Sequence, residues 1–548
     1  EEVDLKAINP IEFRQEQGIH NIKDLVLLIG AISAYDRGDF KTADTLFNQI
    51  VDKQLGYDCE AVLNYLHWSG LFWYIGQGQR SEALAQQARA ITDSLGCSYF
   101  AKAQTLEQLG NIQAAYHGNA PKAIELIEQA IHEIQKSTAT LADSILPFYY
   151  NSLATAHFSN RDMLEARKAQ EESLRILQKK NPLTRVDSLL RAMGLVNLAS
   201  MDMEVRSMDD ARDRLTEALA IEKRIYPEQH PSIAQTLNLF SKYHLLNGSL
   251  SQALTYQLAI LEIREALLPT EHYQMGHAYH NIAFLMKSEP KNVDEALRYA
   301  KMAVQNFASQ SPVDTLSLAI AHGTVYSIYM QTGDYKQAKT HLQQSRMLKL
   351  ALLNNDLLHD EFYKGHFDQA EYYYATEDYE NAISAIDTAM IIANRLAEKG
   401  AASTQDFIIL TNSKIKALTK IGKCNDAMLL LPTLKQYRDQ LSDPARSKEV
   451  PNHALVMLSY ARCTQDLALA QEQVAMVDRY FDQQNQPLSA RQRLKQANAY
   501  QILAELHNQL GEQAKAATYN RKALTLVEDS FPPQYYTVRD MYKLRSNL

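Results

Sequence analysis

One pattern of polar and apolar positions recurs along the chain: a turn residue, a few polar residues, an alanine, and a small or apolar residue seven positions later. Its clearest copies are residues 38–43, 333–338 and 377–382. Residues seven apart lie two turns apart on one stripe of a helix, so a neighbouring helix can approach closely there. The pattern therefore predicts pairs of packed helices. We call the alanine of each copy its anchor, and the twelve anchors are Ala43, Ala83, Ala123, Ala166, Ala211, Ala253, Ala296, Ala338, Ala382, Ala427, Ala470 and Ala516.

A second signal has the same period as the anchors, which lie 40 to 46 residues apart with a mean of 43. Prolines follow seven of the anchors by sixteen or seventeen residues. Proline cannot continue a helix interior, so each of them marks the end of the second helix of a pair. These prolines are Pro182, Pro227, Pro269, Pro312, Pro444, Pro487 and Pro532.

The repeat resembles the tetratricopeptide repeat. In that family a helix ends near a Gly-Asp-Tyr-like turn, as at residues 333–335, and the second helix carries two small residues seven apart and a closing proline. The ordinary repeat has a period of 34 residues. A period in the low forties is similar to the kinesin-light-chain subtype, and residues 225–296 match it most closely.

The resemblance implies an all-α fold, a right-handed superhelical solenoid of about twelve helix-turn-helix repeats over residues 21–533. Residues 1–20 are then an N-terminal cap or linker, and residues 534–548 a C-terminal cap or tail. Each hairpin is apolar on two faces and buries them only by stacking on its neighbours. The first helix of each pair lines the concave wall.

The resemblance also indicates candidate binding residues. In that family, the positions fourteen and fifteen residues before the anchor face the concave groove. Asparagine amides there can both donate to and accept from the backbone of an extended peptide, as in kinesin light chains and bacterial peptide-pheromone receptors. The alternative is that these asparagines are tolerated polar residues on a solvated face. The candidates are Asn151, Asn197, Asn238, Asn281 and Asn412.

Composition narrows the classes of partner and ligand that the chain could bind. The net charge of −8 argues against a nucleic-acid binder, which would carry a basic stripe. The longest apolar run, residues 25–32, is far shorter than the ~20 residues of a membrane span, so we expect no direct membrane insertion. His277 and His280 could share a helix face, but no further metal ligand lies at a sensible spacing. We expect no cofactor and no metal.

The distribution of charge and the positions of the cysteines each allow two interpretations. Residues 356–387 carry a net charge of −8 and residues 414–448 a net charge of +5. These segments either form a bipolar groove that orients a charged partner or, as we favour, pair with each other internally or simply present solvated faces. Cys59 and Cys97 lie near corresponding points of neighbouring hairpins, so a disulfide is conceivable in an oxidising compartment, although we expect two reduced thiols. The chain begins at Glu1 rather than Met, which leaves the compartment open.

Two functions remain. The first is a protein–protein interaction scaffold that binds an extended peptide or partner segment in the concave groove. The second is the sensory domain of a larger bacterial signalling protein whose effector domain lies upstream. No Ser/His/Asp, Cys/His or paired-carboxylate arrangement stands on a suitable scaffold, so we do not expect an enzyme.

Overall fold

The computed structural model describes residues 61–74 and 78–547, with gaps at 311–312, 354–355, 357–358, 360–361, 399–401, 485–486 and 534, and a few positions before residue 61. Over these residues it contains α-helices, one 3₁₀ helix and no strand, which confirms the all-α prediction. The anchor Ala43, the candidate cap at residues 1–20 and Gln534 lie outside the described residues.

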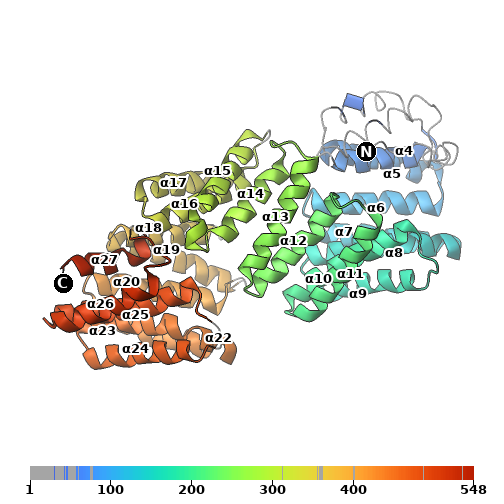
Figure 1. The fold of residues 1–548 in the computed structure, drawn as a ribbon. Coiled ribbons are helices and arrows are strands. Elements are labelled where there is room, and N and C mark those ends of the chain that lie inside the picture. Colours follow the sequence, from blue (N-terminus) through green and yellow to red (C-terminus); the bar gives the residue numbers. More distant parts are fainter. Residues whose placement is uncertain are drawn as a thin grey trace. The chain divides into compact units, whose positions relative to one another are not determined.

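The chain divides into two compact units, residues 1–270 (unit 1) and residues 271–548 (unit 2), each a series of packed helix pairs (Figure 1). The helices of unit 1 are α4 (Ala61–Tyr74), α5 (Gly78–Leu95), α6 (Tyr99–Ala115), α7 (Ala120–Gln135), α8 (Ala139–Ser159), α9 (Met163–Gln178), α10 (Arg185–Glu204), α11 (Met208–Ile225), α12 (Pro231–Leu246) and α13 (Leu250–Leu267).

Unit 2 continues the same arrangement. Its helices are α14 (Tyr273–Met286), η1 (Pro290–Asn292), α15 (Val293–Ser309), α16 (Thr315–Thr332), α17 (Tyr335–Leu352), α18 (Tyr363–Ala375), α19 (Tyr379–Glu398), α20 (Thr404–Lys420), α21 (Cys424–Asp439), α22 (Asp443–Lys448), α23 (Val450–Thr464), α24 (Leu467–Asp482), α25 (Ala490–Gln509), α26 (Gln513–Val527) and α27 (Tyr536–Asn547).

The anchors explain why the helices pair. From Ala123 to Ala516, every anchor is at most 1% exposed, because its small side chain lets the first helix of the pair approach. The position seven residues later is buried as well. Where it is a serine, the hydroxyl is satisfied by the facing helix: Ser173 Oγ donates to the Pro147 carbonyl and Ser345 Oγ to the Ala319 carbonyl, both at 2.7 Å.

One predicted anchor is wrong. Ala83 is exposed, as is Ala90 seven residues later. Ser81 and Ala88, two positions earlier, are fully buried instead, and Ser81 Oγ lies 3.1 Å from Ser69 Oγ on the facing helix. A serine stands at the anchor position of this repeat, so a pattern defined by alanine places its register two residues too late.

Both ends of the second helices follow from local sequence. The turn aspartate of the pattern caps the helix: Asp334 Oδ1 accepts from the backbone N–H of Gln337 at 3.1 Å. Helices α9, α11, α13, α15 and α26 each end shortly before one of the predicted prolines, which confirms that part of the pattern. Pro444 is different, because it lies inside the additional short helix α22.

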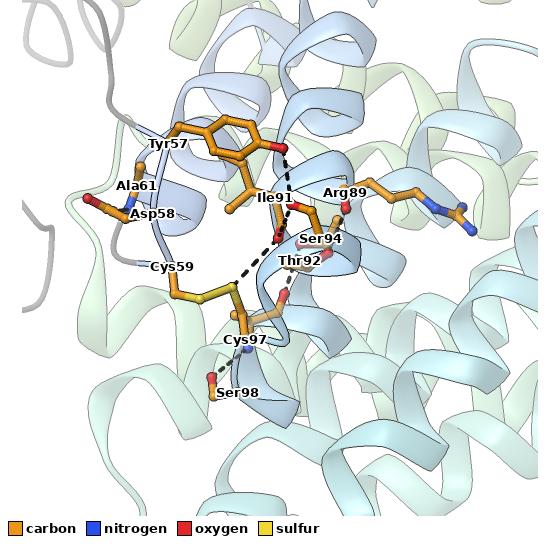
Figure 2. The surroundings of a disulfide bond; sticks show 12 residues. Tyr57, Asp58, Cys59, Ala61, Arg89, Ile91, Thr92, Ser94, Cys97 and Ser98 are labelled. Carbon is orange, nitrogen blue, oxygen red and sulfur yellow. Dashed lines mark hydrogen bonds between the residues drawn. A yellow bond between two sulfur atoms is a disulfide. The ribbon is translucent and has the colours of Figure 1, made fainter.

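The expectation of reduced thiols is wrong. Cys59 is joined to Cys97 across 38 positions, at the starts of successive first helices (Figure 2). Cys424 is joined to Cys463 across 39 positions, between the turns of two successive repeats. The second bond was not predicted, because Cys424 and Cys463 lie three and seven residues before their anchors and so do not occupy corresponding points of their repeats. Both bonds link neighbouring repeats.

Membrane insertion was not expected. None of the helices in the described part of the chain is both long and apolar enough to cross a membrane.

Candidate functional site

The first helices of four successive repeats in unit 2 line a cavity of about 330 Å³. These are α18, α20, α23 and α25, and residues of α19 and α27 complete the wall. Each first helix contributes residues three or four positions apart, so each presents a single stripe. The residues of this stripe lie 18, 15 (or 14), 11 and 8 (or 7) positions before the anchor. We call these positions the inner stripe.

The position eleven residues before the anchor lines the cavity in all four repeats. It is occupied by Glu371, Lys416, Ser459 and Glu505. Sequence reasoning missed this position because it followed asparagines fourteen and fifteen residues before the anchor. One helical turn further along the same stripe would have shown three charged residues and a serine facing one another.

Two charge pairs are matched around this cavity. Arg462 forms an ion pair with Glu505, which also accepts a hydrogen bond from Gln501 Nε2 at 2.8 Å. Arg539 is paired with Asp540 at 3.4 Å. The acidic segment 356–387 and the basic segment 414–448 contact each other through a further ion pair, in which Lys414 Nζ lies 2.5 Å from Asp387 Oδ1.

Burial shifts the pKa values of two further charged groups in the wall, Glu371 and Lys416. It raises the pKa of Glu371 to about 7, with Asp368 adding to the effect, so this carboxyl group is partly protonated at neutral pH. Burial also lowers the pKa of Lys416, and the neighbouring charge of Lys495 lowers it further. Both shifts follow from removing charged groups from bulk water.

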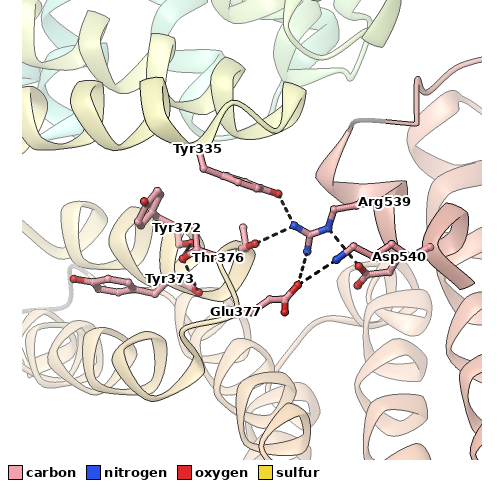
Figure 3. Close-up of polar contacts among 9 residues, drawn as sticks. Tyr335, Tyr372, Tyr373, Thr376, Glu377, Arg539 and Asp540 are labelled. Atoms are coloured by element: carbon pink, nitrogen blue, oxygen red, sulfur yellow. Dashed lines mark hydrogen bonds and ion pairs between the residues drawn. The ribbon is translucent and has the colours of Figure 1, made fainter.

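The C-terminal helix α27 and the residue before it contact the turns of three successive repeats in unit 2, and Figure 3 shows two of these turns. Tyr535, just before the helix, donates to the Pro290 carbonyl at 3.3 Å. Arg539 donates to Tyr335 Oη at 3.2 Å and to the Ala375 carbonyl at 3.4 Å, and it forms an ion pair with Glu377. The predicted C-terminal tail is therefore a docked helix, held by contacts far away in sequence.

The predicted asparagines fall into different environments. Asn151 is buried, and its Oδ1 accepts from Asn197 Nδ2 at 3.1 Å, while the same amide of Asn197 donates to Gln170 Oε1 at 3.0 Å. The structure thus brings these two candidates together, in a network that joins α8, α9 and α10. Asn238 is exposed on α12, and its Oδ1 accepts from Gln257 Nε2 at 2.9 Å.

The other two candidates lie in unit 2 and are half-buried. Asn281 is on α14 and Asn412 on α20. Asn412 Oδ1 is buried and has no hydrogen-bond partner among the described residues. Its neighbour Ser413, rather than Asn412, lines the cavity.

Unit 1 carries exposed apolar residues on the inner stripe. Phe148 is 37% exposed and Met193 is 52% exposed, and each stands eighteen residues before its anchor. The equivalent residue of α25, Asn498, lines the cavity of unit 2. The position eighteen residues before the anchor lines the cavity in α25 alone of these four first helices, and by that register we expect Phe148 and Met193 on the inner faces of α8 and α10.

The clustered histidines serve local structure. His272 Nδ1 accepts from the backbone N–H of Gln274 at 3.2 Å and so caps α14. His277 packs edge-on against Phe307. Within the described ranges, no group of three or more His, Cys, Asp or Glu side chains is placed to hold a metal ion.

Comparison with known proteins identifies the repeat. Residues 190–266 match the family model of the tetratricopeptide repeat. No curated protein matches the chain in sequence.

Several solved structures resemble the chain. The apo form of RapI matches with a TM-score of 0.50 and 11% identity over 70% of this chain and 97% of its own. A Rap protein complexed with competence and sporulation factor has a TM-score of 0.48 and 13% identity, over 74% and 99% of the two chains. BtubC from P. vanneervenii has a TM-score of 0.38 and 18% identity, over 42% and 92%. At these identities the likeness to RapI speaks for the fold alone.

Proposed function

Because the chain carries tetratricopeptide repeats, the fold of a protein-interaction scaffold, we propose that it binds an extended peptide or partner segment along the inner stripe of its first helices. The proposal rests most directly on unit 1, where Phe148, Met193 and Asn238 are exposed on successive first helices. Large exposed apolar side chains on a concave repeat surface are typical of interaction sites.

An extended peptide fits this chemistry. Its alternate side chains point the same way, so apolar ones can cover Phe148 and Met193. Fully burying one such side chain contributes about 1.5–3 kcal/mol. The Asn238 amide group can donate to a backbone carbonyl of the peptide while its Oδ1 still accepts from Gln257.

The remaining asparagines take different parts in the proposal. Asn281 and Asn412 are half-buried on α14 and α20, so each would offer a partner only part of its amide, and Asn412 would do so beside the cavity rather than in its wall. Asn151 and Asn197 already share a hydrogen bond, so they act by fixing the spacing of α8 and α10.

The test uses peptides selected from a random library displayed against the full chain. Their dissociation constants are then measured by fluorescence polarisation on the Met193→Asp variant and on Leu164→Asp. Leu164 is a matched control, because it is 64% exposed and lies on the second helix α9. We expect at least tenfold weaker binding for Met193→Asp and no change for Leu164→Asp.

A second variant tests how much the asparagine side-chain amides contribute to peptide binding. The Asn238→Ala, Asn281→Ala double variant is expected to bind the same peptides severalfold more weakly. Binding that survives Met193→Asp and is lost in Leu164→Asp would place the partner on the outer face and end the proposal.

A further inference from the structure

The cavity of unit 2 contains two lysines that lack an acidic partner. Lys416 and Lys420 lie one turn apart on α20, and both line the cavity. In the part of the chain that the structure describes, neither ammonium group has a carboxylate within ion-pair distance or a hydrogen-bond partner. Unpaired ammonium groups in a partly desolvated space favour an anion from outside the chain.

The other charged groups of the wall do not supply that anion. Glu505 and Asp540 are engaged with Arg462 and Arg539, respectively. The remaining carboxyl group, Glu371, is partly protonated at neutral pH because burial raises its pKa to about 7. Lys420 therefore adds an unmatched positive charge to the wall, and Lys416, whose pKa burial lowers, would be held in its charged form by a carboxylate bound beside it.

A second polar group in the wall is also unsatisfied. Gln501 is 6% exposed, and its Nε2 donates to Glu505. This contact fixes the orientation of the amide, because a reversed amide would place its oxygen against a carboxylate. Its Oε1 is buried and has no hydrogen-bond partner among the described residues. Because Gln501 lines the cavity, a small shift of its side chain would bring this oxygen within reach of a ligand N–H or O–H group.

The rest of the wall is largely apolar. Phe367, Leu455, Ile502 and Met541 face the cavity from four different helices. The volume of about 330 Å³ is at the lower end of the range of small-molecule sites, roughly 300–1,000 Å³. Apolar walls with a few polar groups are typical of such sites.

We infer that this cavity binds a small organic carboxylate. The carboxylate pairs with Lys416, the apolar body lies against Leu455 and Ile502, and a donor group on that body reaches Oε1 of Gln501. Arg539, Asp540 and Met541 of α27 form one side of the site, so the docked C-terminal helix completes it. The inference does not depend on peptide binding in unit 1.

Matched acids and amides test the inference on the full chain. The probes are octanoate with octanamide, and indole-3-acetate with indole-3-acetamide, whose indole N–H supplies a donor. Affinity is measured by isothermal titration calorimetry. We expect each acid to bind at least tenfold more tightly than its amide.

Four variants separate the contacts. Lys416→Gln should abolish the preference for the acid, and Lys416→Arg should keep it because the charge remains. Lys435→Gln removes the same charge from an exposed position on the second helix α21 and should change nothing. Gln501→Met should weaken binding of indole-3-acetate but not of octanoate.

Three results would overturn the inference: equal affinity for acid and amide, no binding of any probe, or unchanged binding by Lys416→Gln. Far-ultraviolet circular dichroism of each variant, together with the Lys416→Arg result, excludes misfolding as the cause of a loss. Peptide binding in unit 1 would be unaffected by all three results.

Discussion

The inner stripes of the two units have the same register and different chemistry. In unit 1 the stripe carries exposed apolar residues, Phe148 and Met193, beside amides that are partly bonded to one another. In unit 2 it carries charged residues around a cavity, and the chain's own last helix completes the wall. The buried anchors fix the hairpins in both units, which leaves the inner positions free to differ.

The largest effect is expected from the disulfides, of which each unit holds one. Each bond closes a loop of about 40 residues, so its removal should lower the free energy of unfolding by about 4 kcal/mol. Cys424→Ser with Cys463→Ser should destabilise unit 2, and Cys59→Ser with Cys97→Ser should destabilise unit 1. Urea unfolding with and without reductant measures both, and a protein indifferent to reductant would contradict the pairing.

A buried carboxylate distinguishes unit 1. Asp202 is 1% exposed and pairs with Arg167 and, at 2.8 Å, with Arg214, so it links neighbouring repeats. Asp202→Asn should cost about 3 kcal/mol, because Arg214 loses its charged partner and Arg167 keeps only Glu171, at 3.6 Å. Asp209→Asn, at an exposed position on α11, should cost almost nothing by the same urea measurement.

The docking of α27 distinguishes unit 2. Arg539→Ala removes the contacts to Tyr335, Ala375 and Glu377 and should cost about 2 kcal/mol. Hydrogen exchange should then become faster in residues 536–547. Arg545→Ala, at an exposed position of the same helix, is the control. Unchanged exchange in Arg539→Ala would mean that this side chain does not hold the helix.

The two units should also differ in how far acid lowers their free energy of unfolding. In unit 2, His322 Nδ1 lies 2.9 Å from His341 Nδ1, and burial, followed by the charge of His341, lowers the pKa of His322 to about 4. The unfolded chain therefore binds more protons below its ordinary pKa of about 6.5, so stability falls as the pH drops from 6.5 towards 4. After allowance for solvent screening, the loss should be about 1 kcal/mol. His322→Phe should flatten that part of the pH profile in urea unfolding, and an unchanged profile would contradict the assignment.

Local features of this fold could be predicted from the sequence, and distant contacts could not. Anchors and prolines determine helix pairs and helix ends because both act within one turn of their own position. Ser81 concealed one register because a small polar residue can fill an alanine site. The docking of α27 depends on Arg539 meeting residues more than 160 positions away, and no repeat signal reports such a contact.

That the five asparagines bind a partner stays a prediction, and the structure adds only which neighbouring positions line the cavity. The stripe around fourteen and fifteen residues before the anchor does line the cavity, through Ser413 and Leu455. Asn412 does not line it, because one position along a helix turns a side chain by about 100°. The sequence shows that Glu371 and Lys416 are ionisable. Only the three-dimensional arrangement shows which charged side chains of the wall lack a partner.

Site-specific photo-cross-linking tests the central claim, that the inner stripe is the binding surface, most directly. Benzoylphenylalanine replaces Met193 in one protein and Leu164 in another, and each is irradiated with a purified peptide selected on the unmodified chain. The account predicts a cross-link from position 193 and none from position 164. A cross-link from position 164 alone would show that partners bind the outer helices.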